Sequence, residues 1–329
     1  TGSIINSWLT HPAFTSFDVN GLWVGKFESG YKGATTRLEA ESNTNESEKL
    51  QIKPNVYSWR KVKISNAHLI SYNYKRELDS HMMKNTEWGA VAYLQHSIYG
   101  SQQSVRINNN MSQITGYAAV DEPTTGYGEY ADIESTALGT NGKKTYMYNT
   151  EIGYKASTTG NISGIYDMSG GAWEYTMGVL ADSNGNPMSG KNNIYNSRFV
   201  GTYGLPGSDN SDSSITENVN GVEWPESKYY DLYTHQTNAT SYKNRILGDA
   251  TGEMGPFWDE TDPDNVTRHK SSWYKDMGHY LHANYPWFYR GGAFNGGTYC
   301  GAFTFMEQTG AAVTSIGYRI ILTPEGGNS

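Results

Sequence analysis

Residues 182–272 constrain the fold most, because this stretch contains few aliphatic residues and no sustained hydrophobic period. A connection of this length without a helix or strand pattern is uncommon in a compact domain, and such segments are usually functional or disordered. Trp224 and Trp258 are scattered through it, and Trp273 directly follows it. Large rings favour loops that pack against a scaffold, so we expect an ordered, loop-rich insert rather than a linker.

Charge and composition narrow the classes of function. The chain has 25 Lys and Arg against 33 Asp and Glu, a net charge of −8. This balance argues against proteins that bind nucleic acid or anionic membranes through basic patches. No apolar run approaches the roughly 18 residues of a membrane span. With 37 glycines and 26 tyrosines, the chain is expected to build a thin aliphatic core supplemented by rings.

Alternation and capping signals predict a few regular elements. Residues 21–30 read as an early strand, and residues 315–322 read as a closing strand. Helices are predicted within residues 65–83 and residues 84–100, the second with Asn85 as its N-cap residue and Gly100 as its stop. The apolar face expected for that second helix consists of Trp88, Val91, Ala92 and Tyr99.

Three separated motifs carry a resemblance to a known family. They are GIYDMSGGAWEYTMG (residues 164–178), RGGAF (residues 290–294) and GYRIIL (residues 317–322). In this order they resemble the G-L-Y-D-M-x-G-N-V-W-E-W, R-G-G-S-W and G-F-R signatures of formylglycine-generating-enzyme-like proteins. The resemblance implies an α+β fold, a variant of the C-type lectin fold with two main helices, small antiparallel sheets and extensive ordered loops. It also implies a single domain over residues 1–329.

The motif residues themselves predict a buried scaffold. Alternation places the rings of Trp173 and Tyr175 in the core while Glu174 between them meets a partner, and Gly170 and Gly171 supply a tight turn. We expect a buried Arg–Glu pairing that organises the loops, and a catalytic carboxylate at Glu174 is the alternative. The residues assigned to this structural motif are Asp167, Trp173, Glu174, Arg290, Gly291, Gly292 and Arg319.

Catalysis is disfavoured by the cysteine and histidine content. The oxidase branch of the family uses a pair of cysteines to hold copper, whereas this chain has only Cys300. Another branch uses a His-x-x-x-His-x-Glu run, whereas the nearest match here is His279 and His282 without a third nearby ligand. We therefore predict a protein that is not an enzyme and requires no cofactor. The alternative is a metal-dependent oxidase-type member of the same fold.

One short acidic segment resembles a calcium loop. Asp182, Asn184 and Asn186 place oxygen-bearing side chains at alternate positions, as calcium-binding loops do. The segment lacks the bidentate glutamate expected at the twelfth position. A structural calcium ion and an Asx turn are therefore both open interpretations.

Residues 286–319 resemble the variable region of target proteins of diversity-generating retroelements. Residues 53–60, 84–100 and 228–254 extend this likeness to gut-bacterial and phage versions. In such proteins, selected side chains of a C-terminal lectin-fold segment are rewritten and form an exposed ligand-binding face. Within this segment, alternation predicts that Phe303 and Phe305 are buried and that Thr304 and Met306 point outward. The residues predicted to form this face are Tyr289, Phe294, Asn295, Thr298, Tyr299, Cys300, Thr304, Met306, Glu307, Gln308, Val313, Thr314 and Ser315.

The resemblance implies a non-enzymatic display protein of the receptor-binding or adhesin type. Rigid rings and small polar groups give this face the composition of an antibody paratope. The expected partner is a protein or a surface glycan, with no nucleic acid and no membrane insertion. The expected location is extracellular, on a bacterial cell surface or a phage virion tail. A structural accessory domain of a pilus or phage tail is the remaining alternative.

Overall fold

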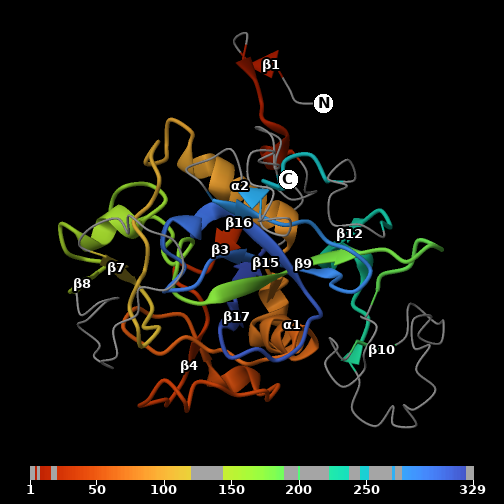
Figure 1. Cartoon of the computed structure of the whole chain (residues 1–329), viewed down its shortest axis with the longest axis horizontal. Coiled ribbons are helices and arrows are strands. Elements are labelled where there is room, and N and C mark those ends of the chain that lie inside the picture. Colours follow the sequence, from red (N-terminus) through yellow and green to blue (C-terminus); the bar gives the residue numbers. More distant parts are fainter. Residues whose placement is uncertain are drawn as a thin grey trace.

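The computed structural model combines two α-helices with several β-sheets (Figure 1). Helix α1 spans Ile64–Tyr74 and helix α2 spans Asn85–Gln95. This confirms the mixed α and β architecture and, within the described residues, the expected pair of main helices. The structure describes residues 4–5, 8–15, 21–119, 144–188, 199–200, 222–236, 245–251, 269–270 and 276–323. Among these residues, no helix is long and apolar enough to cross a membrane.

A seven-stranded mixed sheet forms the centre, with the order β12–β9–β15–β16–β14–β13 and β17 also paired with β9. Strands β9, β15 and β16 are antiparallel neighbours, whereas β12 and β17 run parallel to β9 and β14 runs parallel to β16. The expectation of small antiparallel sheets alone therefore missed this element. Its strands are β9 (Trp173–Leu180), β12 (Asp231–Tyr233), β13 (His269–Lys270), β14 (Met277–Gly278), β15 (Trp287–Gly291), β16 (Gly301–Gln308) and β17 (Ile316–Tyr318).

Smaller sheets of two or three strands surround the central sheet. The three-stranded one has the order β3–β18–β6, and the others pair β1 with β2, β4 with β5, β7 with β8 and β10 with β11. The predicted closing strand is divided at Arg319, because β17 joins the central sheet and β18 joins the three-stranded one. The bounds are β1 (Ile4–Ile5), β2 (Trp8–Leu9), β3 (Trp23–Val24), β4 (Gly30–Tyr31), β5 (Leu50–Gln51), β6 (His81–Met82), β7 (Tyr117–Ala119), β8 (Thr145–Met147), β10 (Phe199–Val200), β11 (Val222–Glu223) and β18 (Ile320–Leu322).

The helices differ from the sequence prediction at their ends. Lys84, not Asn85, is the N-cap residue of α2, and its backbone N–H donates to the Glu87 carboxylate at 2.7 Å. Helix α2 ends at Gln95, so Tyr99 lies beyond it and is 74% exposed. The prediction of a cap at Asn85 and of a buried Tyr99 was therefore wrong. Trp88, Val91 and Ala92 are buried as predicted; helix α1 likewise stops at Tyr74, well before residue 83.

Both faces of the central sheet are covered. Helix α1 contributes Ala67 and Ile70 to one core cluster, together with Met177 and Val179 of β9 and Tyr289 of β15. Helix α2 packs on the other side, where its residues form a second cluster with side chains of β16. Figure 1 shows the two helices on opposite sides of β9 and β15. Because both sides are filled, the central strands are buried along nearly their whole length.

The described part of the 182–272 insert packs as the scattered tryptophans predict. The Trp224 ring stacks on Phe199 with centroids 4.7 Å apart, and on Trp287 of β15 at 5.6 Å. Trp258 and Trp273 lie outside the described residues. This ring stack fixes part of the insert against the sheet face that also packs against α1.

Candidate binding face and its scaffold

The predicted buried Arg–Glu pair is formed by Arg319 and Glu174, both fully buried. The Arg319 Nε and Nη2 atoms lie 3.0 and 2.5 Å from the two Glu174 carboxylate oxygens. The same guanidinium donates to the carbonyls of Gly25 at 2.6 Å and Tyr166 at 2.8 Å. One side chain therefore ties together the start of the chain, the first motif and the last strands.

Arg290 has a different role, although it lies opposite Glu174 in the register of β15 and β9. Its Nη1 donates to the Asn85 amide oxygen at 3.0 Å, which explains why Asn85 faces the sheet rather than capping α2. The guanidinium also donates to four backbone carbonyls, those of Asp249, Ala250, Ala302 and Thr304. Arg290 thus joins the insert to β16 through main-chain atoms.

The two glycines after Arg290 permit a close approach of chains. Gly291 and Gly292 have φ values of +86° and +87°, which side chains rarely adopt. A Cβ at Gly292 would overlap the Cys300 sulfur, and a Cβ at Gly291 would lie 3.3 Å from the Trp88 ring. Gly170 and Gly171 also have positive φ values, as the predicted tight turn requires.

A group of buried carboxyls surrounds the Arg319–Glu174 pair. Asp167 accepts hydrogen bonds from the Asn108 amide at 2.8 Å and the Gly116 backbone at 2.9 Å, while Glu28 accepts one from the Ala172 backbone at 3.2 Å. Burial raises the pKa of all three carboxyls. The pKa of Asp167 is above its ordinary value, that of Glu28 is well above it, and that of Glu174 is raised to about 7. Glu174 is enclosed and bound to Arg319, which favours the structural role over the catalytic alternative. Glu28 was missed because, unlike Glu174, it is not flanked by a ring on both sides.

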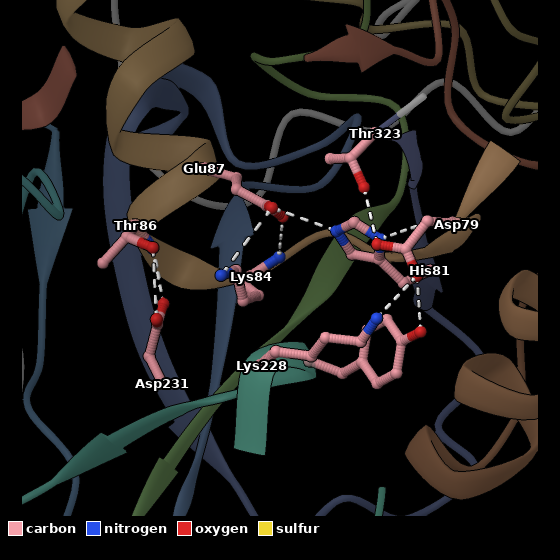
Figure 2. A network of polar contacts seen from close by, with 9 residues as sticks. Asp79, His81, Lys84, Thr86, Glu87, Lys228, Asp231 and Thr323 are labelled. Atoms are coloured by element: carbon pink, nitrogen blue, oxygen red, sulfur yellow. Dashed lines mark hydrogen bonds and ion pairs between the residues drawn. The ribbon is translucent and has the colours of Figure 1, made fainter. Parts of the chain in front are cut away.

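A second polar network anchors the insert to the start of α2 (Figure 2). The Asp79 carboxylate accepts hydrogen bonds from Tyr229 at 2.5 Å, Thr323 at 2.7 Å and Lys228 at 3.1 Å. Burial raises the pKa of Asp79, but these donors outweigh it and lower the pKa overall. Asp79 has a φ of +49°, and its left-handed backbone places it between β6, the insert and the C-terminal strand.

The same network includes two contacts at the first turn of α2 (Figure 2). The Thr86 backbone N–H and hydroxyl donate to the Asp231 carboxylate at 2.7 and 3.1 Å, which fixes β12 beside the helix. His81 Nε2 lies 3.0 Å from the Glu87 carboxylate. Burial opposes charging of His81, but Glu87 raises its pKa overall, and His81 in turn lowers the pKa of Glu87 against the effect of burial.

The candidate face residues of β16 divide between the two sides of the sheet. Tyr289 pairs with Met306 in register and both belong to or contact the core cluster on the α1 side, whereas Phe305 belongs to a third core cluster that includes Tyr280 and Phe288. Glu307 lies on the side of Phe305 by alternation, and its carboxylate contacts the His279 ring. The described candidate residues therefore do not all lie on one surface, because β16, with both sides covered, sends alternate side chains to different environments.

Three candidate face residues are buried, contrary to prediction. Thr304 is 0% exposed, and its hydroxyl donates to the Tyr299 carbonyl at 2.6 Å. Cys300 is 4% exposed beside Gly292 and Gly296, and its thiol donates to the Ala293 carbonyl at 3.0 Å. Burial raises the pKa of this thiol. Tyr289 is 9% exposed, with its ring 4.5 Å from that of Trp173.

The remaining candidates reach the surface in part. Tyr299, Met306 and Val313 are partly buried and pack around the Tyr289 cluster, where the Tyr289 hydroxyl lies 3.5 Å from the Met306 sulfur. Thr314 is exposed. The side chain of Thr298 is outside the described part. The others, Phe294, Asn295, Glu307, Gln308 and Ser315, are half-buried. We define the candidate binding face as Phe294, Asn295, Tyr299, Met306, Gln308, Val313, Thr314 and Ser315.

The segment that carries this face is held through its main chain. The Tyr175 hydroxyl donates to the Ala311 carbonyl at 2.8 Å, and the Trp88 indole N–H donates to the Ala302 carbonyl at 2.7 Å. The Arg60 guanidinium binds the Thr314 carbonyl. The backbone N–H groups of Lys61 and Trp173 donate to the carbonyls of Val313 at 3.1 Å and Ser315 at 3.0 Å.

The side chains of the two candidate metal sites are engaged by contacts within the protein. Asp182 Oδ1 accepts the backbone N–H groups of Asn184 and Asn186, both at 2.8 Å, which is the geometry of an Asx turn. His279 contacts Glu307, and its ring centroid is 6.3 Å from that of His282. Within the described ranges, no three His, Cys, Asp or Glu side chains are placed to hold a metal ion.

Comparison with known proteins adds no assignment. No protein-family model matches the chain, and no curated protein matches it.

Proposed function

We propose that this chain is a non-enzymatic, ligand-binding display protein of the receptor-binding or adhesin type. In this proposal the fold is the formylglycine-generating-enzyme-like variant of the C-type lectin fold, and residues 286–319 are its variable region. The protein acts outside the cell, on a bacterial surface or a phage virion tail. Its partner is a protein or a surface glycan.

The main-chain anchoring of residues 302–315 is the observation that carries the proposal. Trp88, Tyr175 and Arg60 bind carbonyl oxygens of this segment. Every residue type has a carbonyl, so side chains can change at positions 313–315 while the anchors persist. Such a segment is suited to vary its chemistry on a constant backbone.

The chemistry of the candidate binding face is consistent with recognition of a macromolecule. Phe294 and Tyr299 supply rings of low conformational entropy, while Asn295, Gln308 and Thr314 supply adaptable hydrogen-bonding groups. Apart from Glu307, which contacts His279, the candidate residues of this segment carry no charge. Binding would therefore depend on shape and desolvation more than on charge steering.

The enzymatic alternative has less support. A metal-dependent oxidase needs converging ligands, whereas Cys300 is buried and His279 is engaged by Glu307. Metal analysis combined with an oxygen-consumption assay would test this alternative directly: a redox metal with turnover would replace our proposal.

Sequencing the locus from many isolates tests the display function against a structural accessory role. We expect substitutions to concentrate at the candidate binding face and to spare Trp88, Tyr175 and Arg290. A uniform spread of substitutions over residues 276–323 would refute the proposal. As a matched comparison, the exposed apolar residues Ile98 and Tyr99 lie outside this segment and should show no such concentration.

A further inference from the structure

The interior beside the candidate binding face contains more acidic than basic groups. Glu28, Asp167 and Glu174 are at most 1% exposed, and Arg319 lies among them. Arg319 gives both Nε and Nη2 to Glu174. If all three carboxyls were ionised, this group would carry two uncompensated negative charges. Buried charges are costly unless each is paired and hydrogen-bonded.

Glu28 is the carboxyl with the fewest partners. Its Oε2 accepts the Ala172 backbone N–H at 3.2 Å, whereas its Oε1 has no hydrogen-bond partner within the described part of the chain. That oxygen lies against the glycine turn, 2.8 Å from where a Cβ of Gly171 would stand. A buried carboxylate oxygen without a hydrogen-bond donor favours the neutral, protonated form, because a buried charge is costly unless it is paired and hydrogen-bonded.

The charged groups that act on Glu28 are Asp167, Glu174, Arg319 and Arg60. The two acids oppose its ionisation. Arg319 favours ionisation but is bound to Glu174, and the Arg60 guanidinium binds Glu41 at 3.2 Å and the Arg37 carbonyl at 2.8 Å. Burial, the largest influence, raises the pKa of Glu28 and the two acids raise it further.

We propose that Glu28 is a neutral carboxylic acid in the folded protein at physiological pH, and that its ionisation in alkali loosens the glycine turn at residues 170–172, because a further buried negative charge is repelled by Asp167 and Glu174 more than it strengthens the Ala172 hydrogen bond. The turn is the link to the candidate binding face. Ala172 donates to Glu28, the Gly171 carbonyl accepts the Phe294 N–H at 2.9 Å, and Gly170 donates to the Gly291 carbonyl at 3.1 Å. The consequence for ligand binding rests on the proposed function, whereas the proton on Glu28 does not.

The proton can be observed in the unmodified protein. NMR of protein labelled with ¹³C at the glutamate side-chain carboxyl would show which glutamates remain protonated as the pH rises. We expect at least one carboxyl resonance at the protonated position at pH 7, and its absence from the Glu28→Gln spectrum assigns it. If all glutamate resonances are at the ionised position at pH 7, the proposal is wrong. Metal analysis that finds a bound cation together with an ionised Glu28 would also overturn it.

Hydrogen exchange tests the coupling. We expect exchange at Ala172 and Phe294, corrected for the intrinsic rate, to accelerate at least tenfold between pH 7 and pH 10 in the wild type and not in Glu28→Gln. The exposed Glu48 provides the matched control, Glu48→Gln, which should behave as the wild type does. Equal acceleration in Glu28→Gln and wild type would overturn the coupling. Ala67 in α1 reports global opening, and parallel acceleration there would also refute a local effect.

These readouts need no ligand, so they separate the two proposals. If Glu28 is protonated but substitutions do not concentrate on the candidate binding face, the proposed display function is refuted and the inference about Glu28 stands. If the substitutions concentrate there but Glu28 is ionised at neutral pH, only this inference fails. Should Glu28→Gln not fold, sequence-specific assignment of the wild-type carboxyl resonances decides whether Glu28 holds the proton, as distinct from Glu174.

Discussion

Replacing Arg319 by Met should destabilise the protein strongly and in a pH-dependent way. The variant keeps an apolar stem of similar length but loses two hydrogen bonds to Glu174, of 3.0 and 2.5 Å, in addition to those to the Gly25 and Tyr166 carbonyls. A hydrogen bond to a charged group contributes about 1.5–3 kcal/mol, so two contribute about 3–6 kcal/mol. Removing one partner of a buried ion pair costs about 3–5 kcal/mol. We therefore expect the free energy of unfolding to fall by about 4 kcal/mol in mildly alkaline solution.

The pH dependence follows from the carboxyls left behind. Without Arg319, the pKa of Glu174 rises above its wild-type value of about 7, because the attraction of the guanidinium is lost. The folded variant then binds more protons than the folded wild type as the pH rises through 7, so the cost of the substitution grows. Below that pH the carboxyl is protonated in both proteins and the cost is smallest. Each unit of additional pKa shift adds about 1.4 kcal/mol.

Urea unfolding followed by tryptophan fluorescence at pH 6 and pH 8.5 measures this difference. The matched control is Arg76→Met, because Arg76 is exposed, where its guanidinium donates to the neighbouring Asn73 amide and lies 4.7 Å from the Tyr72 ring centroid. Its effect should remain within about 0.5 kcal/mol at both pH values. A cost for Arg319→Met below about 1 kcal/mol, or one that does not grow with pH, would refute the ion-pair argument.

Three further outcomes are expected. Asp182→Ala should cost about 1–3 kcal/mol, the value of two backbone hydrogen bonds, and the cost should be the same with calcium or EDTA; a calcium-dependent melting temperature in the wild type alone would favour the metal interpretation instead. His81→Gln should flatten the pH dependence of stability near neutrality. Burial lowers the pKa of His81, but Glu87 raises it overall. The charged His81 therefore stabilises the folded protein below pH 6.5, and this stability is lost as the pH rises through the pKa of His81 in the folded state. An unchanged urea profile would count against the pair. Gly317→Ala places a Cβ 2.8 Å from the Trp59 carbonyl and should cost about 1–3 kcal/mol by overpacking, measured by thermal unfolding; no loss would mean that β17 adjusts freely.

Local signals in the sequence were sufficient for the scaffold motifs. The alternation of Trp173, Glu174 and Tyr175 predicted an acid among buried rings, and Arg319 is its partner. Gly170 and Gly171 were recognised because a tight turn needs positive φ. These predictions succeeded because each depends on neighbours within a few positions and on one charge pair. The finer fold assignment, by contrast, stays a prediction.

The candidate site was harder to predict because its partners are carbonyl groups and sheet neighbours. Arg290 binds the backbone carbonyls of Asp249 and Ala250. Because every residue has a backbone carbonyl, the residue type does not indicate which ones act as acceptors. Thr304 was expected to point outward because alternation usually separates a buried from an exposed side. That inference fails where both sides of a strand are covered, and nothing in residues 301–308 reports on the cover supplied by two distant helices.

The abundance of tyrosine has a structural basis in polar contacts between segments far apart in the sequence. The Tyr175 hydroxyl binds the Ala311 carbonyl, and the Tyr166 hydroxyl lies 3.2 Å from the Tyr148 carbonyl. The Tyr233 hydroxyl bridges Asn85 and Asp249 at 2.7 and 2.6 Å. Each ring fills the core while its hydroxyl fixes a distant segment, which an aliphatic side chain cannot do. A core built in this way orders loops at their backbones, and this leaves loop side chains available for recognition.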